Sequence, residues 1–136
     1  MPTLAFAFFS DENISGKENT NDLMLEEVLA THNKYRTEQG IPPLVWSERL
    51  AAHAMQWANH LAQSGQLRHS KVLCEGENLW MGKTERFSHA QKVEHWVNEK
   101  KYFKSGIFPD ISTSGNWSDV GHYTQIIWRN TTEVGC

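Results

Sequence analysis

The chain has 136 residues, a length that fits one domain built around a single hydrophobic core. Hydrophobic residues make up 39% and charged residues 21%, and the net charge is −3 with the seven histidines counted as neutral. This composition is typical of a globular domain; it shows no basic stripe that would favour a nucleic acid partner, and no apolar stretch approaches the roughly 18 residues that indicate a membrane-spanning helix.

Residues 1–21 are predicted to be a leader or linker. Residues 4–9 form a short apolar run with no Lys or Arg before it, and residues 10–21 are polar. A secretory signal has a positively charged start and a longer apolar stretch. Two interpretations therefore stay open: the remnant of a signal peptide, and a disordered or loosely packed segment. The folded domain is expected over residues 22–136.

Three helices are predicted from local start and stop signals. The first covers residues 22–39 and is expected to contain His32 as a buried, hydrogen-bonded core residue. The second follows Ser47, a good N-cap, and closes at Ser64-Gly65. The third begins at Ser88, because Ser88 and Gln91 have the spacing of a capping box.

Strands are predicted around a long loop. Residues 76–82 form a short run between two glycines, and residues 104–120 form a loop rich in Gly, Ser, Pro and Asn, a kind of segment that is often functional. Residues 121–129 are predicted to be a strand with side chains alternating between two faces, followed by a turn and a further strand from Val134. The order of elements predicts an α+β domain in which helices cover a small sheet.

Five segments, taken in order, resemble the motifs of one family, which unites cysteine-rich secretory proteins, antigen 5 and pathogenesis-related proteins (the CAP superfamily, with its SCP-like extracellular domain). They are His32-Asn33-Lys34-Tyr35-Arg36 with Pro43-Leu44-Val45-Trp46, Arg68-His69-Ser70, Gly76-Glu77-Asn78-Leu79-Trp80, Trp96-Val97-Asn98-Glu99, and the stretch from Gly121 to Thr131. The resemblance covers about residues 22–136, and its style is closer to short microbial members than to disulfide-rich animal venom proteins.

The chain departs from the family pattern at its C-terminal end. Family members usually continue past the Gly-Cys pair into a last strand, whereas this chain stops at Cys136, so the domain is expected to lack that strand. Two cysteines, Cys74 and Cys136, cannot form a disulfide framework. They either pair with each other, or Cys136 has a partner outside this sequence.

The resemblance implies a three-layer α-β-α sandwich with a small, mostly antiparallel central sheet and a surface cleft. It also implies that His69, Glu77, Glu99 and His122 converge there. In that cleft His69 and His122 would hold Zn²⁺ or another divalent cation weakly, and Glu77 or Glu99 would act as a catalytic base. From the residues alone, a structural hydrogen-bonded histidine or a loop-tethering carboxylate explains the same positions.

Aromatic residues in and beside the long loop form a second candidate site. These are Tyr102, Phe103, Phe108 and Trp117. One interpretation is a small core beneath the loop. The other is an apolar patch that contacts a sterol or fatty acid, because family members are associated with lipid binding through an aromatic loop.

Three functions are compatible with these features. The favoured one is a secreted, extracellular module that binds a lipid, a sterol or a macromolecule, or that serves in defence. The alternative is a metal-dependent, protease-like hydrolase that uses the two His and two Glu; a third is a scaffold whose surface signals to other cells. The sequence shows no nucleophile triad and no familiar protease motif, so binding is favoured over catalysis and enzymatic activity stays open.

Overall fold

A computed structural model of the chain describes residues 3–9, 17–82 and 86–136. Strands and helices alternate through these ranges. The strands are β1 Thr3–Phe9, β2 Val45–Trp46, β3 Glu75–Met81 and β4 Glu133–Gly135. The α-helices are α1 Lys17–Glu38, α2 Glu48–Ser64, α3 His89–Val97 and α4 Gly121–Ile126, and two 3-10 helices are η1 Asn98–Tyr102 and η2 Trp117–Val120.

The strands form one sheet in the order β2-β4-β1-β3. Every neighbouring pair in it is parallel. The expected α+β architecture is confirmed, but the expectation of a mostly antiparallel sheet is wrong for the described strands. The reason is the chain order: a helix separates each strand from the next, so each connection carries the chain back to the starting edge of the sheet.

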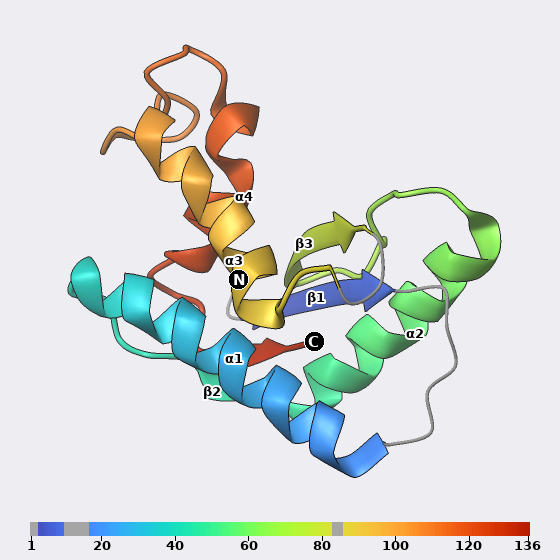
Figure 1. Cartoon of the computed structure of the whole chain (residues 1–136). Coiled ribbons are helices and arrows are strands. Elements are labelled where there is room, and N and C mark those ends of the chain that lie inside the picture. The colour runs from blue at the N-terminus through green and yellow to red at the C-terminus, as the bar shows by residue number, and fades with distance from the viewer. Residues whose placement is uncertain (1–2, 10–16, 83–85) are drawn as a thin grey trace.

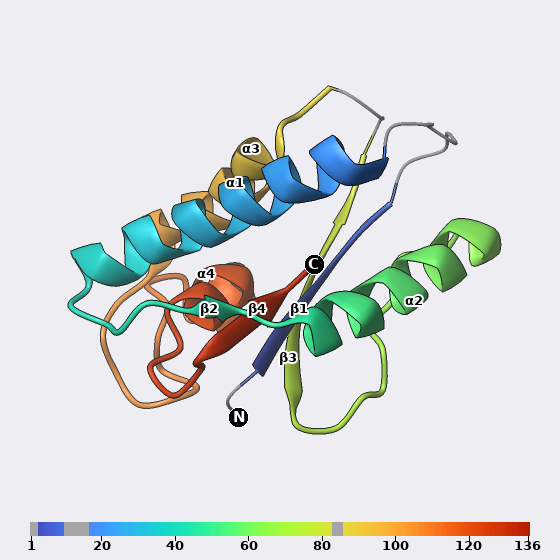
Figure 2. The same cartoon turned by 90° about the horizontal axis from the view of Figure 1, so that it is seen from below.

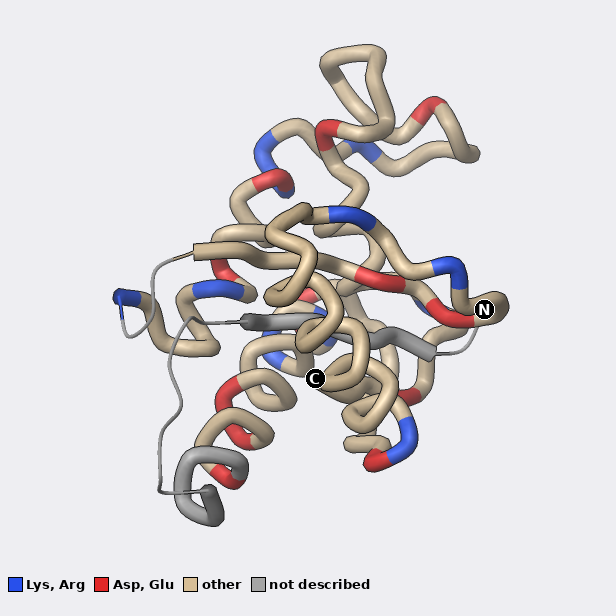
Figure 3. Tube along the Cα trace, turned by 90° about the vertical axis from the view of Figure 1, so that its right-hand side faces the viewer, with Lys and Arg blue, Asp and Glu red and all other residues tan. Residues whose placement is uncertain are grey.

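Helices cover both faces of this sheet, which gives the three layers. Helices α1 and α3 lie side by side over one face and α2 lies over the other (Figures 1 and 2). The larger core cluster joins α1, α3 and α4 and includes Val28, Val93, Trp96, Tyr123 and Ile126. A smaller cluster of Ala58, Leu61 and Leu79 joins α2 to β3. Lys and Arg are scattered among Asp and Glu over the described helices and loops (Figure 3).

The segment predicted to be a leader has a place in the sheet. Residues 3–9 form β1, which lies between β4 and β3 and pairs with β3 over its full length. Helix α1 begins at Lys17, inside the stretch predicted to be a linker, and residues 10–16 of that stretch lie outside the described residues. Whether residues 1–21 act as a leader stays a prediction.

Predictions based on local signals are confirmed for α2 and α3. Helix α2 follows Ser47 as predicted, although the Ser47 side chain makes no capping hydrogen bond, and it ends at Gly65, which adopts the left-handed conformation with a φ of 63°. The prediction of a strand over residues 121–129 is wrong, because Gly121–Ile126 form α4 directly after η2, and residues 127–129 lie in turn and loop structure. Tyr123 and Ile126, three positions apart, are the buried residues of α4. Burial thus follows the helical period rather than the alternation of a strand.

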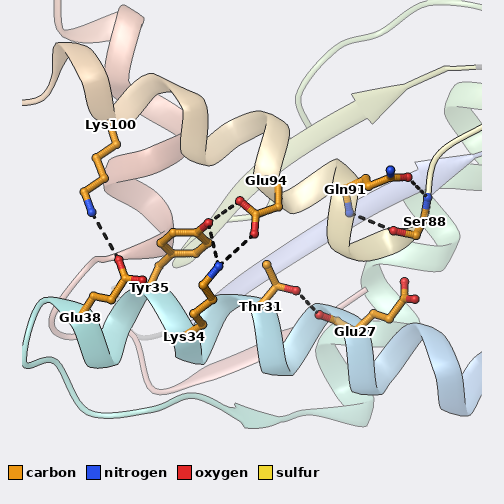
Figure 4. A network of polar contacts seen from close by, with 9 residues as sticks. All are labelled: Glu27, Thr31, Lys34, Tyr35, Glu38, Ser88, Gln91, Glu94 and Lys100. Atoms are coloured by element: carbon orange, nitrogen blue, oxygen red, sulfur yellow. Dashed lines mark hydrogen bonds and ion pairs between the residues drawn. The ribbon is translucent and has the colours of Figure 1, made fainter.

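Polar side chains join α1 to α3 (Figure 4). The Tyr35 hydroxyl donates to Glu94, and Lys34 Nζ lies 3.5 Å from Glu94 Oε1. The predicted capping box is confirmed, since Gln91 N donates to Ser88 Oγ (3.1 Å) and Ser88 N donates to Gln91 Oε1 (2.8 Å). Glu27 of α1 also accepts from backbone N–H groups in the first turn of α3. These contacts fix the position of α3 against α1. They therefore also fix the position of η1, which directly follows α3.

His32 is buried in α1, as predicted. Its side chain is fully shielded from solvent, and Nδ1 donates to the backbone oxygen of Val28 at 2.7 Å. Burial lowers the pKa of His32 to about 4, because the apolar surroundings disfavour the imidazolium; the hydrogen bond to Val28 opposes this effect and the Arg36 charge adds to it. The native state therefore holds His32 neutral.

The burial of His32 predicts a loss of stability in mild acid. Between pH 6.5 and about 4 the unfolded chain binds a proton at His32 that the native state does not bind. The free energy of unfolding therefore falls as the pH falls through this window, by roughly 3 kcal/mol from this residue. Urea unfolding at several pH values should show a shallower pH dependence for His32→Gln, a variant that cannot titrate. Equal slopes for the two proteins would contradict the assignment.

Candidate functional site

His122 and Glu99 form a hydrogen-bonded pair. His122 lies in the first turn of α4 and Glu99 in η1, and His122 Nδ1 is 2.6 Å from Glu99 Oε1. The other carboxylate oxygen of Glu99 accepts from Tyr123 N at 3.0 Å. Because a carboxylate only accepts, the hydrogen of a neutral His122 ring lies on Nδ1 and its Nε2 is the acceptor. Glu99 thus fixes both the tautomer and the direction of the ring.

Two buried residues complete the support of His122. The Trp96 ring lies nearly parallel to the imidazole, with 5.9 Å between ring centroids. Asn78 of β3 is buried and donates from Nδ2 to the backbone oxygen of His122 at 3.1 Å. Asn78 belongs to the quoted Gly-Glu-Asn segment, but its bond to a residue 44 positions away had no local signal in the sequence.

His69 and Glu77 form a second pair of the same kind. His69 Nδ1 lies 2.6 Å from Glu77 Oε1, and the same oxygen accepts from Ser70 N at 3.0 Å. His69 lies in the segment between α2 and β3 and is exposed, whereas Glu77 lies in β3. The carboxylate therefore holds this segment against the edge strand of the sheet.

Glu77 and Asn78 are neighbours in β3, and their side chains lie on opposite faces of the strand. Side chains alternate along a strand, so Glu75, Glu77 and Leu79 share one face. That face meets α2, because Glu75 accepts from Arg49 at 2.8 Å and lies 2.9 Å from His53 Nδ1. Asn78 on the other face contacts α4. The cluster of Glu75 with Arg49 and His53 was not predicted. The sequence does show that Glu75 and Glu77 are two positions apart, which is the spacing of residues on one face of a strand.

The described residues do not offer an ordinary zinc site. A histidine whose Nδ1–H is held by a carboxylate has the form that imidazole ligands take, with Nε2 toward the metal. Protein zinc sites use three or four protein ligands, which are His, Cys, Asp or Glu side chains. No group of three or more His, Cys, Asp or Glu in the described part of the chain could hold an ion. The divalent cation therefore stays a prediction, and no chemical step is assigned to it.

A surface cavity of about 560 Å³ lies beside the first pair. Its lining includes Trp80, His95, Trp96, Glu99, Tyr102 and His122. The structure thus brings together three of the predicted site residues, His122, Glu99 and Tyr102, in one cavity. His69 and Glu77 are not part of its lining.

A second cavity, of about 620 Å³, is lined in part by residues that directly follow η1. Its apolar lining consists of Ile41, Phe103, Phe108, Ile111, Ile127 and Trp128. Phe103 and Phe108 come from the predicted aromatic site, whereas Ile41 was missed because it lies far from the loop in sequence, and Ile127 and Trp128 were missed because they were assigned to a strand. Phe103 also packs edge-on against the core residue Tyr123, so it serves both the cavity and the core.

Trp117, the fourth predicted aromatic, is the first residue of η2, at the end of the loop in sequence. Its ring centroid is 5.4 Å from that of Phe108. Both side chains are about half exposed, so they form an apolar surface rather than a closed core. Cys74 is exposed and Cys136 is buried, and no disulfide joins these two described residues.

Comparisons of the sequence with known proteins identify relatives of this chain. The chain is 40% identical to pathogenesis-related protein 1C of Nicotiana tabacum over 111 residues, which are 82% of this chain and 63% of that protein. It is 36% identical to pathogenesis-related protein 1 of Arabidopsis thaliana over 111 residues, 82% of this chain and 64% of that protein. These relatives are plant proteins, whereas the style of the motifs had pointed to short microbial members.

The chain spans a little under two thirds of the length of these relatives. No helix in the described part of the chain is long and apolar enough to cross a membrane. The family model described as "CAP: Cysteine-rich secretory protein family" matches residues 29–136, which include all five quoted segments and both His–Glu pairs. The chain therefore belongs to the cysteine-rich secretory protein (CAP) family.

Proposed function

We propose that this domain is a secreted, defence-related binding module that holds an apolar small molecule, such as a sterol or fatty acid. The relatives are named pathogenesis-related proteins, and the family name describes secretory proteins, which supports a role outside the cell. The observation that carries the ligand class is the cavity of about 620 Å³ with six apolar or aromatic side chains in its wall. Ligand sites of proteins are typically cavities of about 300–1,000 Å³ with such linings.

The polar part of this cavity favours an amphipathic ligand. Gln39, Ser105, Thr124, Arg129 and Asn130 also contribute to its wall. A ligand with an apolar body and one hydroxyl or carboxylate group could satisfy both kinds of surface, since the guanidinium of Arg129 matches a carboxylate well. The proposed ligand is therefore a single-chain fatty acid or a sterol rather than a sugar or a nucleotide.

Binding of a fluorescent sterol or of a fluorescent polyene fatty acid in solution tests this proposal. We expect saturable binding that Phe108→Ala weakens about tenfold or more, because the variant removes one aromatic wall of the cavity. Phe87→Ala is the matched control: it removes a partly exposed phenyl ring that is not part of the cavity, and it should leave the dissociation constant unchanged. Equal affinities for the three proteins would contradict the proposed site.

The metal-dependent hydrolase is the second candidate function. The His122–Glu99 pair favours it, because an imidazole oriented by a carboxylate is a common general base and lines a cavity here. It has less support, because the described residues supply no set of three metal ligands. His122→Ala separates the two functions: it should leave sterol or fatty acid binding intact, whereas a hydrolase would lose its turnover.

A further inference from the structure

The loop between η1 and η2, together with the first residue of η2, exposes large apolar side chains. It projects beyond the helices, away from α2, as the orange segment in Figure 1 shows. Ile107 is 88% exposed and Phe108 is 56% exposed, and Trp117, in contact with Phe108, is 47% exposed. Three large apolar side chains exposed together on one projecting loop and the helix that follows it are unusual, because scattered single exposures are the normal pattern on a protein surface.

Local hydrogen bonds hold this exposed turn in shape. Asp110 N donates to Ile107 O at 2.8 Å, and Lys104 N donates to Ile111 O at 3.0 Å. The turn is also tight at Gly106, where a Cβ atom would lie 2.2 Å from the backbone oxygen of Asp110. Ile111, directly after the turn, is buried. The fold therefore presents Ile107 and Phe108 to solvent in a fixed geometry, and docking them would cost little conformational entropy.

The charges next to the turn are balanced. Lys104 Nζ lies 2.6 Å from Asp110 Oδ1, and both side chains remain exposed. Figure 3 shows charged positions of both signs on this loop. A neighbouring cation and anion complement the phosphate and choline groups of a zwitterionic lipid headgroup, and they give no net attraction to a strongly anionic surface.

The size of the apolar surface favours a bilayer over a protein. The three side chains expose on the order of a few hundred Å² together, whereas a specific protein partner usually covers about 800 Å². A bilayer has no such requirement, because its binding strength grows with whatever apolar area enters the boundary between headgroups and acyl chains. Trp side chains are typical of that boundary, since they combine an apolar ring with an N–H donor.

We propose that the turn of residues 104–110, together with Trp117, is a membrane-docking tip that inserts Ile107 and Phe108 into the surface of a zwitterionic bilayer. Phe108 also lines the cavity of about 620 Å³, so docking brings this cavity next to the lipid. The transfer of a lipid or sterol from the bilayer into the cavity rests on the proposed function. The docking itself does not.

Flotation of the whole chain with phosphatidylcholine vesicles tests the docking tip. We expect the chain to float with the vesicles and Ile107→Asp to lower the partition coefficient about tenfold or more, because a charged side chain replaces the most exposed apolar one. Added salt should change the wild-type partition little, because the balanced charges contribute no net attraction. Trp117→Ala should lower it as well.

Leu73→Asp is the matched control. Leu73 is 86% exposed, almost as much as Ile107, and lies in the segment before β3, away from the tip. This variant should keep the wild-type partition coefficient, and both aspartate variants should unfold at the wild-type urea concentration. The proposal is overturned if the wild-type chain does not float, if Leu73→Asp and Ile107→Asp reduce flotation equally, or if Ile107→Asp instead abolishes a dimer of the chain seen by analytical ultracentrifugation.

The two proposals fail in different ways. Ile107 is not part of the cavity wall, so Ile107→Asp should lose vesicle binding but keep its affinity for a fluorescent sterol presented in solution. Vesicle binding by a chain that binds no soluble sterol or fatty acid would refute the proposed ligand and support the docking tip. Soluble ligand binding without vesicle binding would refute the docking tip and support the proposed ligand.

Discussion

Replacing Arg36 by methionine should destabilise the domain by about 3–5 kcal/mol. Its side chain is fully buried, and it donates to the backbone oxygens of Pro42, Ile126, Trp128 and Thr131 at 2.8–3.0 Å. Three of these oxygens belong to the end of α4 and the segment that follows it. Methionine fills much of the volume but leaves all four oxygens without this donor. Urea unfolding followed by tryptophan fluorescence measures the effect.

Two further variants make the Arg36 prediction specific. Arg36→Lys should recover only a small part of the loss, because one ammonium group cannot reach four oxygens that the planar guanidinium reaches in different directions. Arg86→Met removes an exposed arginine and should change the free energy of unfolding by less than about 0.5 kcal/mol. A loss below about 1 kcal/mol for Arg36→Met would show that water replaces the guanidinium at these oxygens.

Gly135→Ala is the second substitution with a large expected effect, a loss of about 3 kcal/mol. Strand β4 passes so close to the start of α2 that a Cβ atom at position 135 would lie 2.2 Å from Ala51 N and 2.5 Å from Leu50 C. Both are backbone atoms, so relief requires a shift of the whole helix. The midpoint of urea unfolding should fall while its slope stays unchanged, because the substitution strains the native state and leaves its extent of burial similar.

The matched control for this variant is Gly121→Ala. A Cβ atom at position 121 would have its nearest contact with the Trp117 ring at 3.6 Å, an ordinary van der Waals distance. Gly121 also has helical backbone angles, so alanine should be neutral or slightly stabilising there. If both alanine variants were equally stable, β4 and α2 would have to be separated more widely than the structure shows.

Elements with local boundary signals were predictable from the sequence. Ser88 and Gln91 form the capping box of α3, and Gly65 ends α2, because these bonds join residues only a few positions apart. The family was predictable for a different reason: five short motifs in a fixed order form a specific signature. The burial of His32 was predictable from its place among the apolar residues of α1.

The segment of residues 121–129 shows where local pattern fails. The strand prediction assigned its side chains to two alternating faces, but the segment from Gly121 to Ile126 forms a helix that buries Tyr123 and Ile126 against α1 and α3. Arg36, 90 positions earlier, accommodates the end of this helix by donating to Ile126 O. A local sequence pattern that spans about ten residues cannot predict a contact between residues 90 positions apart.

The sequence by itself determined the family, the α+β class, the bounds of α2, the start of α3, and the residue types of the candidate site. Only the tertiary structure decided which of the four residues pair, His122 with Glu99 beside one cavity and His69 with Glu77. It also decided that Ile41, Phe108 and Trp128 line one cavity. Periodicity tells which residues share an element, but only the packing of distant elements tells which side chains meet, because that depends on the path of the whole chain.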